Sequence, residues 1–445
     1  MANKLITPRK LNGFWELMPK EQILFSKMLN TLEETFKQNC FLPLDTPVLE
    51  YSEVLLAKSG GDTDKEVYRL TKGDSDMCMR YDLTVPLARF VSMHQNELNF
   101  PFKRYQIGKV YRGERPQKGR FREFYQCDAD IIGNESLSMV ADAECVYLYE
   151  KCFDALNLDV EIHVSNRKIL AGFIEEIQQT NNSNEIFIIL DKVSKVGEEE
   201  AINMLYELGI EKEICQKLLK ITKTCGNFEE IKQNLCNFSK NELFLQGLTE
   251  LEAVATYINL MGVKKAIFDL SIIRGHNYYT GTVFEVFLKN ENTSIAVGGG
   301  GRYENLCGFF SEKKMPGVGM SIGVTRLFDL LMKSNYFTNL ETNEIDCAII
   351  TFDETFNAGL ELLANLREKG VKAEIFYENK SFKSKMKEAN RRQVKFAVIV
   401  GEDEVSSKVY TLKNMQTGEQ FKLVINELCE KIKSDRMASV MPDRI

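Results

Sequence analysis

Histidine is scarce in this chain of 445 residues, which contains only three, and cysteine follows no metal-binding spacing. The 11 cysteines are odd in number, scattered, and never arranged as Cys-x-x-Cys, so neither a disulfide framework nor a zinc ribbon is expected. A His-rich metal site is also excluded, and a Ser-His-Asp triad has few candidate bases. We therefore expect reduced, mostly buried thiols, as in cytoplasmic proteins.

No apolar run reaches the roughly 18 residues that a membrane-spanning helix needs. The opening segment, Met1–Pro8, shows no apolar signal core followed by a cleavage site. Hydrophobic residues make up 44% of the chain and charged residues 27%, so a sizeable core can form and wholesale disorder is excluded. We expect a cytoplasmic protein of about three domains without membrane association.

The formal net charge of -7 argues against indiscriminate nucleic-acid binding, but the charge is unevenly distributed. Between Lys103 and Arg122 the chain carries eight basic residues and one acid, Glu114. A local cationic segment in an acidic chain is typical of one specific polyanion site. Charge density alone is equally compatible with a solvated basic surface.

Hydrophobic periodicity predicts a helix over 20–38, whereas two prolines make 41–50 extended. Residues 105–111 and 123–132 are predicted to be strands joined by a loop with Gly and Pro, so the basic segment is expected to be a hairpin with a charged tip. From about 166 to 262 there is almost no proline, and Leu/Ile/Glu/Lys patterns indicate a helical insertion.

Strand patterns resume at 266–273, and a glycine-rich strand leads into a predicted helix at 324–333. We expect this first domain to cover 1–335. After a polar stretch, strands and helices alternate over 343–434, which predicts a small α/β domain with a largely parallel sheet, followed by a tail at 435–445. Its expected strands are 345–352, 371–377, 394–401 and 408–413, and its expected helices are 355–369, 380–391 and 423–434.

One face of the second hairpin strand carries Phe124, Gln126, Asp128 and Asp130, because alternate residues of a strand point the same way. An aromatic ring, an amide and two carboxylates are costly in a core. The face is therefore predicted to be the floor of a polar pocket, with an open, solvated sheet face as the alternative.

A second candidate is the pair Asp82 and Thr84, which could hold an ammonium group or simply cap the following helix. The run Gly298–Gly301 fits either a tight turn or close approach to a phosphate. Arg112, Arg274 and Arg326 fall at element junctions and would suit a triphosphate, although Arg326 could instead pair with a surface acid. No G-x-x-x-x-G-K-[ST] or G-x-G-x-x-G is present, so neither a P-loop nor a dinucleotide fold is supported.

These segments together resemble the class II aminoacyl-tRNA synthetases of the histidyl type, over nearly the whole chain. Tyr111–Phe124 resembles the motif 2 loop of that family, and Arg80–Thr84 is similar to its eukaryote-like branch. Arg274–Gly281 and Gly298–Tyr303 resemble its two histidine-specific signatures, which are highly specific when they occur in order. The remaining matches are to motif 1 and motif 3, at Phe41–Glu50 and Gly323–Arg326.

The resemblance implies an α+β catalytic domain built on an antiparallel sheet with a helical insertion, plus a C-terminal α/β anticodon-binding domain. It implies a ligase that activates histidine with ATP, accompanied by Mg²⁺, and transfers it to histidine tRNA. A homodimer with Pro47 at its two-fold interface is also implied. The histidine-binding residues would be Asp82, Thr84, Gln126, Asp130, Tyr278 and Tyr279.

ATP would be bound by Arg112, Glu114, Phe124 and Arg326, with Arg112 and Arg274 as the catalytic cations at the α-phosphate. The tip residues Arg115, Gln117 and Lys118 would approach the acceptor end of the tRNA.

Three residues depart from the family pattern, namely His276, Asn277 and Thr325. Loss of a charged hydrogen bond at Asn277 is expected to weaken the enzyme without abolishing activity, at a cost of about 1.5–3 kcal/mol. A catalytically silent regulator of the ATP phosphoribosyltransferase type is the alternative function. It is disfavoured because such proteins typically lack the terminal domain and the motif 2 charges. A plain nucleotide-binding module is disfavoured by the two histidine signatures.

Overall fold

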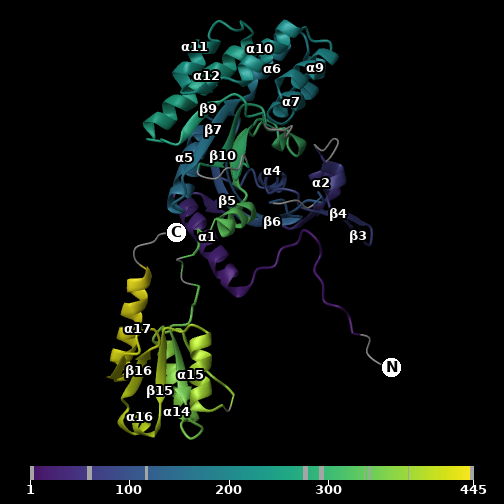
Figure 1. Ribbon diagram of the computed structural model, residues 1–445. Coiled ribbons are helices and arrows are strands. Elements are labelled where there is room, and N and C mark those ends of the chain that lie inside the picture. Colours follow the sequence, from purple (N-terminus) through teal and green to yellow (C-terminus); the bar gives the residue numbers. More distant parts are fainter. Residues whose placement is uncertain are drawn as a thin grey trace. The chain divides into compact units, whose positions relative to one another are not determined.

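The computed structural model describes residues 5–57, 63–115, 119–273, 279–289, 295–334, 336–338, 340, 342–378 and 380–440 (Figure 1). The chain divides into two compact units. The first contains Phe25–Tyr336, and the second contains Phe337–Arg444 together with Leu17–Leu24. Within the described ranges, no helix combines the length and the apolar character needed to cross a membrane.

The first unit is built on a nine-stranded sheet in the order β1-β5-β6-β12-β11-β10-β7-β9-β8. Neighbouring strands are antiparallel except for the pairs β1–β5 and β7–β9. This arrangement confirms the antiparallel sheet expected from the sequence. The strands are β1 (Leu42–Pro43), β5 (Phe102–Tyr111), β6 (Glu123–Ile132), β7 (Val160–Asn166), β8 (Cys225–Gly226), β9 (Ala266–Asp269), β10 (Thr282–Leu288), β11 (Gly298–Tyr303) and β12 (Gly317–Ile322).

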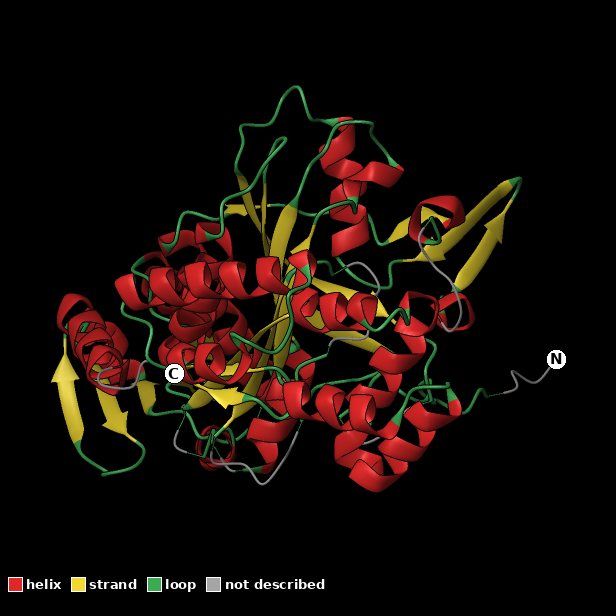
Figure 2. Cartoon of the chain, turned by 90° about the horizontal axis from the view of Figure 1, so that it is seen from above, coloured by secondary structure: helices red, strands yellow, loops and turns green. Residues whose placement is uncertain are grey.

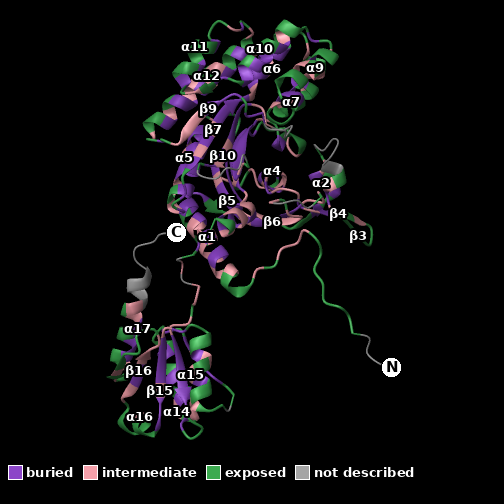
Figure 3. Ribbon diagram, viewed as in Figure 1, coloured by how far each residue is buried: buried purple, intermediate pink, exposed green. Residues whose placement is uncertain are grey.

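Helices cover this sheet, and the strands between them are largely buried (Figure 3). The predicted helices at 20–38 and 324–333 are present as α1 (Pro19–Gln38) and α13 (Val324–Lys333). Two more helices pack on the sheet region, α4 (Thr84–Met93) and α5 (Val140–Ala155). The remaining short helices of this part are α2 (Ser52–Leu55), α3 (Thr63–Glu66) and η2 (Cys307–Phe309).

A separate small sheet follows motif 1, in the order β2-β4-β3. Its strands are β2 (Leu49–Tyr51), β3 (Arg69–Lys72) and β4 (Ser75–Met79). Every residue of β3 is exposed, and the β3–β4 hairpin stands out from the body of the unit (Figure 2).

The region predicted as a helical insertion is helical, except for the two-residue strand β8 that joins the edge of the large sheet. Its helices gather beyond β7 and β9 in Figure 1, with α6 and α12 packed together. They are α6 (Arg167–Glu176), η1 (Thr180–Asn182), α7 (Ser183–Asp191), α8 (Val193–Val196), α9 (Glu198–Glu207), α10 (Lys212–Thr222), α11 (Phe228–Leu235) and α12 (Glu242–Leu260).

The run Gly298–Gly301 forms the start of the central strand β11, so the alternative of a tight turn is wrong. The glycines are required because the neighbouring backbone lies very close. A Cβ on Gly300 would meet the carbonyl oxygen of Gly319 at 2.1 Å and the Cα of Met320 at 2.8 Å. At Gly300 the run is therefore part of a strand whose paired neighbour, β12, lies too close for a side chain.

A Gly300→Ala variant is expected to lose about 1–3 kcal/mol or more of folding free energy, because the methyl group can be accommodated only by separating β11 from β12. Chemical denaturation measures this loss. Gly418→Ala is not an adequate control because its φ of 80° strains any side chain. Ala358→Gly on an unrelated helix gives the scale of an ordinary backbone effect. Unchanged stability of Gly300→Ala would contradict the close approach.

The second unit is a five-stranded sheet in the order β14-β13-β15-β16-β17, with apolar clusters on both faces. The pairs β13–β14 and β13–β15 are parallel, and the other two pairs are antiparallel. The elements are β13 (Cys347–Thr351), α14 (Phe356–Glu368), β14 (Ala373–Ile375), α15 (Phe382–Arg391), β15 (Phe396–Val400), α16 (Glu402–Ser407), β16 (Tyr410–Asn414), β17 (Gln420–Leu423) and α17 (Ile425–Val440).

The terminal sheet differs from the expectation in two elements. The short helix α16 and the edge strand β17 were not expected from the sequence, and the parallel part is limited to three strands. Strand β17 is half exposed and only four residues long, so it carries no continuous apolar run that would reveal it. All 11 cysteines are free thiols, and eight of them are buried, as expected.

Candidate active site

The hairpin of β5 and β6 supplies most of the site. The two strands pair from Phe102 opposite Ile132 to Tyr111 opposite Glu123, and this register sets which side chains face the pocket. The loop base packs on an aromatic cluster in which Trp15 stacks on Phe121 with ring centroids 5.2 Å apart. The basic segment is thus a hairpin, as predicted, and ring packing holds its base.

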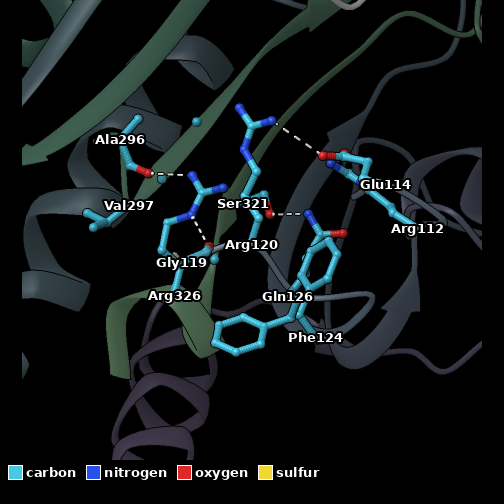
Figure 4. A pocket seen from close by; sticks show the side chains of 14 residues that line it. Arg112, Glu114, Gly119, Arg120, Phe124, Gln126, Ala296, Val297, Ser321 and Arg326 are labelled. Carbon is cyan, nitrogen blue, oxygen red and sulfur yellow. Dashed lines mark hydrogen bonds and ion pairs between the residues drawn. The ribbon is translucent and has the colours of Figure 1, made fainter. Parts of the chain in front are cut away.

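An outer compartment of about 250 Å³ opens between this hairpin, β11 and the start of α13. Its size and polar lining fit an extended polar ligand. Figure 4 shows Arg326 on one side and Arg112 with Glu114 on the other. Glu114 is the one carboxylate among the described lining residues, which are Arg112, Glu114, Gly119, Arg120, Phe121, Phe124, Gln126, Ala296, Val297, Gly298, Gly299, Ser321, Gly323 and Arg326.

The guanidinium of Arg326 is directed into the outer compartment from the first turn of α13. Its Nε donates to the carbonyl oxygen of Gly119 at 3.1 Å, and its Nη1 donates to that of Ala296 at 3.0 Å. These bonds link the motif 2 loop to the segment before β11.

Arg112 lies at the boundary between the outer compartment and a smaller inner one, and lines both. Its Nε donates to the carbonyl oxygen of Tyr81 at 3.3 Å. Its guanidinium carbon lies 4.4 Å from the ring centre of Tyr81 and 5.2 Å from that of Phe124. Two aromatic faces therefore hold one cation where the compartments meet.

The inner compartment is narrow, at about 50 Å³, and is strongly polar. It lies above the β6 face that was predicted to form a pocket floor, and that prediction is confirmed for Gln126, Asp128 and Asp130. The lining residues are Asp82, Thr84, Arg112, Gln126, Asp128, Asp130, Tyr279, Gly299, Gly300, Gly301, Tyr303, Gly319, Met320 and Ser321.

Asp82 caps a helix, one of the two roles considered for it, and it also faces the inner compartment. Its Oδ1 accepts the backbone N–H groups of Thr84 at 3.0 Å and Val85 at 2.9 Å, which caps α4, and its side chain also lines the inner compartment. Burial raises the pKa of Asp82, while the two amides and Arg112 oppose that shift. Thr84 lies beside it on the same wall.

Asp130 is engaged on both carboxylate oxygens. Tyr303 Oη donates to its Oδ1 at 2.9 Å, and the Arg104 guanidinium lies 2.6 Å from its Oδ2. Arg104 is fully buried, and Asp130 is 2% exposed. Burial raises the pKa of Asp130, and the positive charge of Arg104 opposes this.

Gln126 and Thr325 connect the floor to its neighbours. Gln126 Nε2 donates to Ser321 Oγ at 2.9 Å, so the amide is held in place on β12. Thr325, one of the departures from the family pattern, accepts the backbone N–H of Tyr125 at 2.8 Å and is buried. In this chain that position ties α13 to β6.

Several predicted site residues lie outside the described residues, namely Arg274, Tyr278, Gln117 and Lys118, together with the departures His276 and Asn277. Arg115 is described and exposed near the hairpin tip. Tyr279 lines the inner compartment, and its Cδ1 would meet a Cβ on Gly301 at 2.8 Å.

Sequence reasoning missed three residues that shape the inner compartment: Arg104, Tyr303 and Ser321. Arg104 was counted only as part of the basic segment, and its pairing with Asp130 depends on the hairpin register. Tyr303 was noted only as part of a signature. Within that signature, Arg302 has a structural role, because its Nη2 pairs with buried Asp142 at 2.5 Å.

Comparisons with known proteins match this geometry. The family model described as Histidyl-tRNA synthetase covers residues 13–327, and the model described as Anticodon binding domain covers residues 346–435. Among curated proteins, the histidine–tRNA ligase of Clostridium acetobutylicum is 43% identical, covering 96% of this chain and 100% of that protein. The histidine–tRNA ligase of Clostridium tetani is 40% identical, with coverage of 98% and 100%.

A solved structure gives the same result. The crystal structure of histidyl-tRNA synthetase from Nostoc sp. PCC 7120 superposes with a TM-score of 0.86 at 34% identity, covering 97% of this chain and 100% of that one. These matches confirm the expected fold class, a class II catalytic domain followed by an anticodon-binding domain. The chain belongs to the histidyl-tRNA synthetase family.

Proposed function

We propose that this chain is an active histidine–tRNA ligase, which joins histidine to ATP in the two-compartment pocket and then charges histidine tRNA. The observation that carries the proposal is the position of Arg112, which among the described residues is the one cation lining both the narrow acidic compartment and the wider basic one. A carboxylate in the first and an α-phosphate in the second would meet beside it. The regulatory alternative is less supported, because both family domains are present and the curated relatives are ligases.

In the inner compartment, Asp82 and Thr84 hold the α-ammonium group of histidine, with Gln126 nearby. Asp130 and Tyr279 bind the imidazole, together with Tyr278. A carboxylate-rich wall suits a cation, and narrow walls exclude larger side chains. The support is that five of these six residues line one compartment or both.

In the outer compartment, Phe124 stacks on adenine, Arg112 binds the α-phosphate and Arg326 binds the γ-phosphate. Mg²⁺ would enter with ATP. Within the described ranges, no cluster of three or more His, Cys, Asp or Glu side chains could hold a metal ion. Mg²⁺ commonly uses one or two carboxylates plus substrate phosphates, so the single lining carboxylate, Glu114, fits such an ion.

The chemistry follows from charge. The histidine carboxylate attacks the α-phosphorus of ATP, and both reactants are negative. Arg112, with Arg274 as the second cation, offsets this repulsion and stabilises the charge that develops in the transition state. The aromatic faces of Tyr81 and Phe124 hold Arg112 in place before the substrates arrive.

Transfer to tRNA uses both units of the chain. Arg115, Gln117 and Lys118 at the hairpin tip approach the acceptor end, and the terminal unit binds the anticodon. In that unit Tyr377 is 79% exposed and Phe352 is 42% exposed, the latter stacked on Phe382 at 5.2 Å. Exposed rings of this kind are suited to stacking on unpaired RNA bases.

The chain acts as a homodimer, with Pro47 at the two-fold interface. Support comes from apolar side chains exposed around that proline, where Leu42 is 58%, Leu49 44% and Tyr51 59% exposed. These exposed side chains lie within five residues of Pro47 in the chain, and a protein interface would bury them. The cytoplasm is the proposed location, because 11 free thiols suit a reducing compartment.

The function is tested by histidine-dependent exchange of pyrophosphate with ATP, followed by charging of histidine tRNA. An active ligase performs both reactions, and a silent regulator performs neither. Omission of histidine, or its replacement by another amino acid, should abolish exchange.

Removal of residues 343–445 should separate the two reactions. Exchange should continue, because both compartments lie in the first unit, whereas charging should fall severely with the loss of the anticodon contacts. Residual tRNA binding should weaken with salt, as phosphate contacts release counterions. A folded, dimeric truncated chain that has lost exchange would contradict this division of roles.

A further inference from the structure

Of the carboxylates that the described residues bring to the inner compartment, Asp128 is the one without an assigned partner. It lines the compartment from β6, between Gln126 and Asp130, and is only 3% exposed. Among the described residues, its Oδ1 has no hydrogen-bond partner. A buried, unsatisfied carboxylate oxygen costs folding free energy, so a ligand that satisfies it is favoured.

Each of the other charged groups at the inner compartment has an observed or proposed partner of opposite charge, and Asp128 has none. Asp130 is neutralised by Arg104, at 2.6 Å. Asp82 is stabilised by two backbone amides and has the α-ammonium group of histidine as its proposed partner. Arg112 is committed to the phosphate. Asp128 keeps only the hydroxyl of Ser321 on β12, which is neutral.

Asp128 is surrounded by charged groups from several elements of the first unit. Burial raises the pKa of Asp128 to about 7; Arg104 and Ser321 oppose the rise, and the nearby negative charges reinforce it. The charged or titratable neighbours are Arg104 on β5, Asp130 on β6, Asp82 before α4, Tyr303 on β11, Arg112 at the boundary and Tyr279.

We propose that Asp128 is a histidine-selecting residue that shares one proton with a ring nitrogen of the bound amino acid, so that histidine and a proton are held together. The inference rests on the proposed function of the pocket. The proton can lie on the ring or on the carboxyl group. In both cases one hydrogen bond joins the imidazole to Asp128, and the net charge of these two groups together is zero. A neutral side chain of similar shape that cannot exchange a proton with Asp128 is then disfavoured.

The inference has a specific pH signature. Above about pH 7 free Asp128 loses its proton, so binding of histidine must take one up, and affinity should fall about tenfold per pH unit. Below about pH 6.5 the free ring is protonated, and binding must release a proton. The loss of histidine affinity at alkaline pH is caused by deprotonation of Asp128, whereas the loss at acid pH is caused by protonation of free histidine.

The test is calorimetric titration of the full-length chain with histidine from about pH 6.5 to about pH 8.5, in two buffers with different ionisation enthalpies. The wild-type chain should take up about one proton per histidine near pH 8. Asp128→Asn carries a neutral amide at every pH, so it should take up none, and its affinity should stay level across the alkaline range. The KM for ATP should be unchanged.

Asp154→Asn is the matched control, since it removes one carboxylate from the exposed end of α5, beside Lys265, and should keep the wild-type profile. A melting curve checks that each variant folds, and Asp128→Ser replaces Asp128→Asn if the amide does not fold. Absence of proton uptake in the wild type, or uptake that persists without the Asp128 carboxyl, overturns the inference. A folded wild-type chain that lacks histidine-dependent exchange would instead overturn the proposed function.

Discussion

An Arg112→Ala variant should form histidyl-adenylate about 10²–10³-fold more slowly than the wild type. The guanidinium lines both compartments and is held by the carbonyl oxygen of Tyr81 and by two ring faces. Its charge is therefore in place where negative charge develops, and a water molecule in the vacated space would have to reorient to replace it. Single-turnover adenylate formation measures the effect.

Arg112→Lys gives the graded comparison. Lysine keeps the charge but loses the planar fork that binds two oxygens, so most of the defect should remain. Histidine affinity should change less than the rate in either variant, because Asp82, Gln126 and Asp130 still line the inner compartment. Near-normal turnover per folded site in Arg112→Ala, with a lowered melting temperature, would show a structural role instead.

The second large effect is expected at Asp130. Asp130→Ala should raise the KM for histidine about 10- to 100-fold through loss of a charged hydrogen bond, with a much smaller change for ATP. It should also cost about 3–5 kcal/mol of stability, because Arg104 is fully buried and would lose its counter-ion. Steady-state kinetics measures the change in the KM for histidine, and chemical denaturation measures the loss of stability.

A double variant, Arg104→Met with Asp130→Leu, distinguishes the two roles. Replacing a buried ion pair by apolar residues is often neutral or stabilising, so stability should return. Histidine recognition should not return, because the carboxylate is still missing. Recovery of histidine binding together with stability would mean that Asp130 only supports the fold.

The floor of the pocket could be predicted from β6 alone, because strand alternation places Gln126, Asp128 and Asp130 on one face whatever the rest of the fold. The partner of Asp130 could not be predicted in this way. Arg104 lies opposite Asp130 only in the observed register of β5 and β6, and a shift of one residue would turn Arg104 to the other face. Sequence periodicity does not determine that register, because it depends on the long loop between the strands.

The glycine run shows a second limit. Gly298–Gly301 carries no side chains, so it gives no strand alternation to read, and a turn was an equal expectation. Its true constraint comes from Gly319 on β12, the next strand along the chain, which pairs with β11 and approaches Gly300 closely. The local composition indicates that the backbone is crowded at this run, but it does not identify the segment that crowds it.

The aromatic cluster at the hairpin base also provides an optical reporter. Trp15 is the one tryptophan in the sequence, and it stacks on Phe121, which itself lines the outer compartment. Tryptophan emission from this chain therefore arises from a single residue, and that residue stacks on a ring that lines the outer compartment. Changes in the wavelength or quenching of Trp15 emission on addition of ATP would report rearrangement of the hairpin loop. This measurement needs no label, mutation or coupled assay.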